Sequence, residues 1–225
     1  MGGRGSSSMT AATGRGASAK PAGFEIDLSK DYQKIKTGMA PQDALDVAAD
    51  QIKGLPYEMS VLVAPDGTVY AAKGKEGSVI PPYGNVLADG HDMSKVMDLH
   101  NHPSEGKRGI GGTTSDADWE VMFAMKQTES YITAKEGRYI QRITDPSKIA
   151  SAKAFFSTST STGRRKQSNY ERHITKTYRE GWKKGKYRGE DGPYVAAQHV
   201  LQKFGKRYGF EVVFEPNPGY EHLYD

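Results

Sequence analysis

Apolar residues along the chain change from helical to strand-like spacing, and this pattern predicts the first elements. Pro41 precedes apolar residues at helical spacing that end before Gly54, so we expect a helix of about three turns there. Residues 59–64 and 68–72 are strand-like, and the Asp-Gly pair between them is a strong signal for a tight turn. The patterned part of the sequence therefore begins with a helix and a β-hairpin.

A loop rich in glycine and proline, residues 74–90, separates this hairpin from the next elements. Residues 96–100 are then expected to form a short strand. A helix is expected to begin near Ser115, because three apolar residues recur at helical spacing after it. These are Trp119, Met122 and Phe123. Residues 131–134 and 139–143 predict a second hairpin.

The C-terminal part shows two further amphipathic patterns after a Ser/Thr cluster at residues 157–162. The first helical pattern consists of Tyr170, Ile174 and Tyr178. The second, which begins at Pro193, consists of Ala197, Leu201, Phe204 and Tyr208. Residues 210–215 alternate between apolar and other side chains, as a terminal strand does.

These patterns divide the chain into three parts. Residues 1–23, mostly Gly, Ser, Ala and Thr, are interpreted as a disordered leader or linker, either native or introduced by cloning. Residues 24–150 are expected to form a compact α/β domain with one sheet, whose core spans residues 54–144. Residues 151–225 are expected to form a basic helical extension with a terminal strand.

Composition excludes several classes of protein. Of the 225 residues 36% are hydrophobic, mean hydropathy is −0.69, and no apolar run suits a membrane span or an ordinary signal peptide. Cysteine is absent, which excludes disulfides, thiolate metal sites and a cysteine nucleophile. We therefore expect a cytoplasmic protein without a membrane partner, or a segment of a larger phage or toxin polypeptide. Any metal must be held by His and carboxylate side chains.

The formal charge of +4 conceals an uneven distribution. Residues 151–210 contain 14 Lys or Arg and four Asp or Glu, a net charge of +10, whereas residues 1–150 carry −2. The candidates for contact with a polyanion or substrate are Lys183, Lys184, Lys186 and Arg188, which lie among aromatic residues. Weak contact with nucleic acid or an acidic protein is one interpretation, and a solvated helix surface is the other.

Two histidines at the end of the strand predicted over residues 96–100 are the main chemical signal. Side chains alternate along a strand, so His100 and His102 point to the same side and can share a metal ion. Asp118, in the first turn of the next helix, can be aimed at the same point. Two imidazoles and one carboxylate leave an open position on a tetrahedral ion, which is typical of catalytic zinc. Glu58, at the start of the first strand, is the candidate base.

Each of these residues also has an ordinary structural interpretation. A His-x-His pair can lie on a surface strand without a metal, Ser115 and Asp118 can simply cap a helix, and Glu58 can be solvated. Asp116 is the rival carboxylate ligand, although its spacing from Ser115 is less suitable. The remaining histidines, interpreted as surface or helix residues, are His91, His173, His199 and His222.

The order of the candidate residues resembles the signature of the JAB/MPN (JAMM) metalloproteases. That signature has a Glu before a strand-turn-strand, a His-x-His-Pro run at the end of a later strand, and a Ser-x-x-Asp that opens the following helix. The His-Asn-His-Pro-Ser run at residues 100–104 is most similar to the RadC-like branch. The resemblance covers residues 54–144 and implies a JAB/MPN-like (cytidine-deaminase-like) mixed sheet flanked by helices.

The resemblance also implies roles for individual residues. A Zn²⁺ ion would be held by His100, His102 and Asp118. Glu58 would act as general acid/base, and Ser115 would stabilise the oxyanion of the tetrahedral intermediate. The implied reaction is hydrolysis of a peptide or isopeptide bond in a protein or peptide substrate, with deconjugation of ubiquitin-like proteins as one form of it.

The segment after His102 departs from the family pattern. Twelve residues separate His102 from Ser115, where the family usually has seven. The extra residues are rich in glycine, so the segment can loop out without moving the ligands. We expect it to lie beside the active site, within reach of substrate.

Other classes of function compete with this interpretation. PHP-type phosphoesterases and amidohydrolases also begin a site with Asp-Leu-His-x-His, but they need further ligands from a barrel of about 200 residues or more. Only three histidines follow His102, all in or after the basic segment. A non-catalytic scaffold that binds a partner protein, or a nucleic-acid-associated module that uses the basic helices, needs no metal at all. Zinc content therefore separates the hydrolase from the last two.

Overall fold

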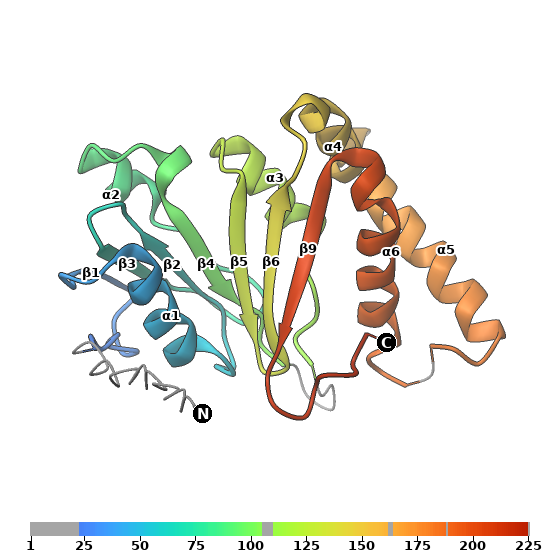
Figure 1. The fold of residues 1–225 in the computed structure, drawn as a ribbon, viewed down its shortest axis with the longest axis horizontal. Coiled ribbons are helices and arrows are strands. Elements are labelled where there is room, and N and C mark those ends of the chain that lie inside the picture. The colour runs from blue at the N-terminus through green and yellow to red at the C-terminus, as the bar shows by residue number, and fades with distance from the viewer. Residues whose placement is uncertain (1–22, 105–109, 162–163, 188, 225) are drawn as a thin grey trace, which may run out of the picture.

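Residues 23–104, 110–161, 164–187 and 189–224 are described by a computed structural model of the chain. Their main feature is a seven-stranded sheet with the order β1-β3-β2-β4-β5-β6-β9 (Figure 1). The strands are β1 (Tyr32–Lys36), β2 (Met59–Val63), β3 (Thr68–Lys73), β4 (Met97–Asn101), β5 (Glu129–Ala134), β6 (Gly137–Ile143) and β9 (Phe210–Pro216). Neighbouring strands are antiparallel except β4 and β5, which are parallel. The expected α/β class with a mixed sheet is confirmed.

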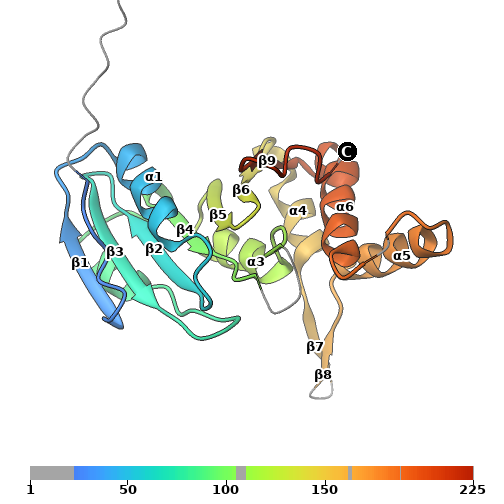
Figure 2. The ribbon, with the colours of Figure 1, turned by 90° about the horizontal axis from the view of Figure 1, so that it is seen from below.

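Six α-helices of the described residues flank this sheet. They are α1 (Pro41–Ile52), α2 (Tyr83–Ala88), α3 (Asp116–Ala124), α4 (Ile149–Phe156), α5 (Asn169–Lys183) and α6 (Gly192–Tyr208). Figure 2 shows α1 and α3 on opposite sides of the sheet. The predicted helix 41–52 is confirmed: its proline lies in the first turn, and Gly54 follows the end with a φ of 76°.

The two faces of the sheet bury separate apolar clusters. Leu45 of α1 packs with Val61 and Leu99 on one face. On the other face α2 covers β2 and β3, whereas α3, α4 and α6 cover β5, β6 and β9 around Trp119. The indole ring of Trp119 stacks on Phe156 at a centroid distance of 4.4 Å. Between α2 and α3, this second face carries a pocket over β4.

The C-terminal segment is part of the same packing unit. Strand β9 pairs with β6 from Phe210 to Pro216, and α5 packs against α6. Tyr170 and Leu201, both after residue 150, belong to the same buried cluster as Trp119. The segment expected as an extension therefore completes the sheet and its larger core.

Some local expectations are wrong. The loop expected at residues 74–90 contains α2. The Ser/Thr cluster contains β7 (Ser159–Ser161), which pairs with β8 (Arg164–Lys166) in a projecting hairpin (Figure 2). Strand β1 and helix α4 were not expected. These elements are short, and β1 alternates only between exposed and half-buried positions, so pairing and packing partners define them more than local periodicity does.

Most of the predicted leader, residues 1–22, lies outside the described residues. Within the described ranges, the helices lack the combination of length and apolar character needed to cross a bilayer.

Candidate metal centre

Strand β4 places both histidines on the face of the sheet that carries the pocket. Leu99 packs on the α1 side, so its neighbour His100 points to the opposite side. His102 follows the end of β4, but its backbone N–H donates to the Thr133 carbonyl at 2.9 Å. This hydrogen bond continues the line of β4 beside β5, and the two imidazoles converge with Nε2 atoms 3.2 Å apart. The predicted orientation of the histidines is confirmed.

Asp118 is fixed by a capping box at the start of α3. The Asp118 backbone N–H donates to the Ser115 hydroxyl oxygen at 3.2 Å. The carboxylate Oδ2 of Asp118 in turn accepts hydrogen bonds from the Ser115 backbone N–H at 2.7 Å and from its hydroxyl at 2.8 Å. The carboxylate held in this way faces both histidines, with Oδ1 towards His100 and Oδ2 towards His102.

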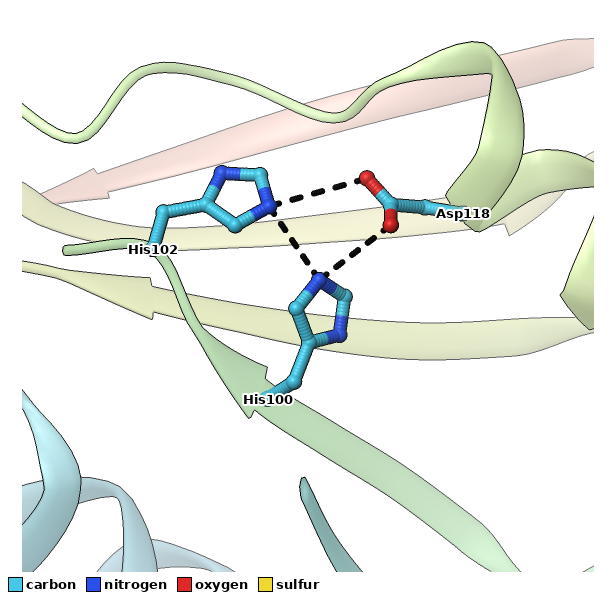
Figure 3. Close-up of side chains that lie close together, drawn as sticks. All are labelled: His100, His102 and Asp118. Atoms are coloured by element: carbon cyan, nitrogen blue, oxygen red, sulfur yellow. Dashed lines mark hydrogen bonds and ion pairs between the residues drawn. The ribbon is translucent and has the colours of Figure 1, made fainter. Parts of the chain in front are cut away.

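The three side chains meet at one point (Figure 3). His100 Nε2 lies 3.3 Å from Asp118 Oδ1, and His102 Nε2 lies 3.7 Å from Asp118 Oδ2. Ligands about 2.0–2.2 Å from a tetrahedral ion are separated by about 3.3–3.6 Å, close to the observed separations. Within the described residues, one ligand atom from each of these three side chains lies within 4.8 Å of the other two, and together they could hold a metal ion. Two imidazoles and a carboxylate at this spacing are compatible with a bound metal ion.

The electrostatics of the centre follow from burial and from Asp118. Burial disfavours the charged form of His100, but the Asp118 carboxylate outweighs it and raises the pKa of His100 to about 9. Burial lowers the pKa of His102 despite the same attraction. For Asp118, burial acts to raise the pKa, yet the charge and hydrogen bond of His100 hold it well below its ordinary value. A divalent cation would replace the His100 proton in this arrangement.

A hydrogen bond also fixes the orientation of His102. Its Nδ1 lies 3.2 Å from the carbonyl oxygen of Gly112, which can only accept. Nδ1 therefore carries the proton, and the lone pair of Nε2 faces His100 and Asp118. A metal-ligating histidine is commonly held by such a bond on its other nitrogen.

The centre opens into a pocket of about 380 Å³ between α2 and α3. Glu58 lines this pocket together with Ser115, as the predicted base and oxyanion-binding residue should. Glu58 is half-buried at the start of β2, and its backbone is fixed by hydrogen bonds to Lys75 and Gly74 at 3.0 and 2.8 Å. Its charge is close enough to favour the protonated form of His100. The structure thus brings together the five residues predicted for the metal centre, whereas the basic candidates lie elsewhere.

Two further polar residues line the pocket and were not among the predicted site residues. Asp98 is buried on the same face of β4 as His100, and Tyr83 of α2 donates to its Oδ2 at 2.7 Å. Burial, followed by the charge of Asp98, raises the pKa of the Tyr83 hydroxyl. The position of Asp98 two residues before His100 was a usable signal, because period two places both on one face. Tyr83 had no such signal, since it comes from α2, in a segment whose sequence favours a loop.

The rival carboxylate and the other histidines are not members of the converging group. Asp116 is buried, but Asp118 is the carboxylate that joins the histidines. His91 contacts the Tyr70 ring, His173 packs on Phe204, and His199 Nδ1 lies 2.8 Å from the Tyr187 hydroxyl. His222 is also outside the group of three.

The basic candidates occupy a different part of the molecule. Lys183 ends α5, and Lys184 and Lys186 follow it, all three exposed. Helix α5 lies outside α6 in both views (Figures 1 and 2). Arg188 and residues 105–109 of the glycine-rich loop lie outside the described residues.

Comparison with known proteins found no matching family model, no matching curated protein and no matching solved structure.

Proposed function

We propose that the chain is a zinc-dependent hydrolase of the JAB/MPN type, similar to its RadC-like branch, that cleaves a peptide or isopeptide bond. The observation that supports this most is the convergence of His100, His102 and Asp118 at separations of 3.2–3.7 Å. Three protein ligands leave one position of a tetrahedral zinc ion open, as catalytic sites require. The pocket beside the ligands provides room for a substrate.

A bound zinc ion would supply Lewis-acid activation of water and of the scissile carbonyl. In this proposal, Glu58 accepts the proton of the attacking water and transfers it to the leaving amine. Its half-buried position on the pocket wall suits both steps. Ser115 holds Asp118 by two hydrogen bonds and lines the same pocket. A serine hydroxyl has a single proton to donate, so in this proposal the hydroxyl turns from Asp118 to the developing oxyanion while the Ser115 backbone N–H keeps the ligand oriented.

The competing interpretations do not account for this arrangement of side chains. A non-catalytic scaffold or a nucleic-acid-associated module does not need two buried imidazoles and a carboxylate aimed at one point beside a pocket. A phosphoesterase of the barrel type needs more ligands than this group provides. The exposed lysines near the end of α5 still offer a surface for an acidic partner.

Zinc analysis of purified protein tests the proposal. We expect about one zinc per chain, lost in the double variant His100→Ala with His102→Ala and kept in the control His91→Ala, because His91 lies outside the centre. Zinc that survives the double substitution would overturn the metal site.

Glu58→Gln separates metal binding from catalysis. We expect this variant to keep zinc, because Glu58 is not among the converging ligands, and to lose hydrolysis of peptide and ubiquitin-like fusion substrates. Substrate turnover is measured against the wild type at equal zinc content. Retained turnover would assign the base to another residue.

A further inference from the structure

The glycine-rich segment between the metal ligands ends in a tightly held stretch, residues 110–114, here called the return loop. Gly112 of this loop accepts the hydrogen bond from His102 Nδ1 at 3.2 Å. The position of the Gly112 carbonyl therefore decides how the His102 imidazole is oriented.

A buried carboxylate holds this part of the return loop. Glu136, in the turn between β5 and β6, has no exposed surface. Its Oε2 accepts from the Gly111 N–H at 2.9 Å, and its Oε1 accepts from the Gly112 N–H at 2.8 Å. The Tyr139 hydroxyl donates to Oε1 at 2.8 Å as well. Because burying a carboxylate is costly without partners, these three donors fix Glu136, and Glu136 fixes the two glycine amides.

Glycine is required where the return loop meets the ligand strand. A Cβ on Gly111 would lie 2.5 Å from the carbonyl oxygen of His102. Gly112 has a φ of 86°, and a Cβ there would overlap the Tyr194 ring of α6. The backbone of the loop can therefore lie directly against His102 only with these two residues.

The far end of the return loop is tied to the C-terminal helices. Thr113 Oγ1 donates to Gln198 Oε1 of α6 at 2.7 Å, and the Tyr170 hydroxyl of α5 donates to the Thr114 carbonyl at 2.9 Å. These contacts are buried, but neither involves Gly112. They provide matched controls, since they hold the same loop without holding the carbonyl that contacts His102.

We propose that Glu136 is a positioning residue for the metal centre: by clamping the Gly111 and Gly112 amides, it sets the Gly112 carbonyl that orients His102. This inference rests on the proposed metal site. Partners that orient metal-ligating histidines typically contribute about 10- to 100-fold to metal affinity. The amide of a glutamine cannot accept at both of its ends, so Glu136→Gln loses one of the two backbone bonds.

The test compares Glu136→Gln with Tyr170→Phe, which removes the hydrogen bond at the other end of the return loop. Zinc affinity is measured by chelator competition, and the His102 tautomer is read from the imidazole nitrogen resonances of the metal-free protein. We expect Glu136→Gln to weaken zinc binding about 10- to 100-fold and to lose the fixed Nδ1–H form of His102. We expect Tyr170→Phe to keep both properties, even where it lowers the melting temperature of the metal-free protein.

Zinc affinity and tautomer like those of the wild type in a folded Glu136→Gln variant would overturn the clamp. An equal loss of zinc affinity in Tyr170→Phe would also overturn the clamp, because general loosening of the return loop would then explain the loss in both variants. If Glu136→Gln does not fold, Glu136→Asp is measured in its place, and its shorter carboxylate is expected to give the same direction of change. Failure of the wild type to bind zinc would overturn the proposed function, whereas the tautomer measurement would still decide the role of Glu136.

Discussion

Asp118 shows how one residue can satisfy a structural and a chemical role together. Its Oδ2 closes the capping box with Ser115, whereas its Oδ1 lies 3.3 Å from His100 Nε2. The two interpretations of Ser-x-x-Asp, a helix cap or a metal ligand, are therefore compatible. The cap aims the carboxylate, and the aimed carboxylate can bind the ion.

Substitution of the two acidic residues of the α3 first turn tests which one is the ligand. We expect Asp118→Asn to weaken zinc binding by more than about 100-fold, because residues that only orient ligands already contribute 10- to 100-fold. Asp116→Asn is expected to leave zinc affinity unchanged, since Asp118 is the carboxylate that joins the histidines. Chelator competition measures both variants. A larger loss in Asp116→Asn than in Asp118→Asn would reverse the ligand assignment.

The sequence predicts the three candidate ligands better than it predicts the polar residues around them. Period two in the strand and the Ser-x-x-Asp spacing were sufficient to predict the orientation of His100, His102 and Asp118. The polar residues around them, such as Tyr83 and Glu136, are brought there by tertiary packing over separations that no local pattern encodes.

The elements assemble the centre through the single parallel pair of the sheet. Strands β4 and β5 are parallel, so the chain must cross over between them, and α3 lies in that crossover. The return from the end of β4 brings the N-terminus of α3 beside the carboxyl end of the strand, where ligand sites of such units commonly lie. This connection explains why a histidine pair and a helix-capping Asp can meet.

Helices and strands with a strong periodicity of apolar residues were predicted from the sequence. Those that depend on tertiary contacts were not. Helix α1 and the β2–β3 hairpin follow from apolar spacing and a turn signal. Helix α2 has six residues and begins after Pro82 in a segment rich in breakers, so its sequence favours a loop. It is stabilised as a helix by Val86, which packs on Leu62 and Tyr70.

Leu201→Ala tests whether the C-terminal helices belong to the main core. Leu201 has no exposed surface and shares a cluster with Trp119, so we expect a loss of about 2–5 kcal/mol in the free energy of unfolding. The matched control Leu87→Ala removes a side chain that is 56% exposed and is expected to cost less than about 0.5 kcal/mol. Urea denaturation measures both. Equal, small losses would indicate that residues 151–225 pack loosely on the sheet.

The proposed metal chemistry and the most basic surface lie in different parts of the molecule. The candidate metal centre lies over β4 between α2 and α3. Helix α5 lies outside α6 (Figure 1). Four basic residues follow one exposed face of α5 at steps of three or four: Arg172, Lys176, Arg179 and Lys183. Trp182, 53% exposed, adds an aromatic surface at the end of this row. A substrate or partner bound to this basic row would contact a surface away from the candidate metal ligands.

Charge reversal of Lys183, Lys184 and Lys186 to Glu tests whether this surface holds the substrate. Zinc content and kcat are expected to stay unchanged, because these exposed side chains lie away from the centre and binding that is equal in ground and transition states does not alter the chemical step. For an acidic protein substrate we expect KM to rise at low salt. The rise should shrink at moderate salt, since contacts between exposed charges are screened over about 8–10 Å at 0.10–0.15 M. A KM that matches the wild type at both salt concentrations would assign the lysines to solvent, and a change in kcat would mean that the reversal disturbs the fold around the metal centre.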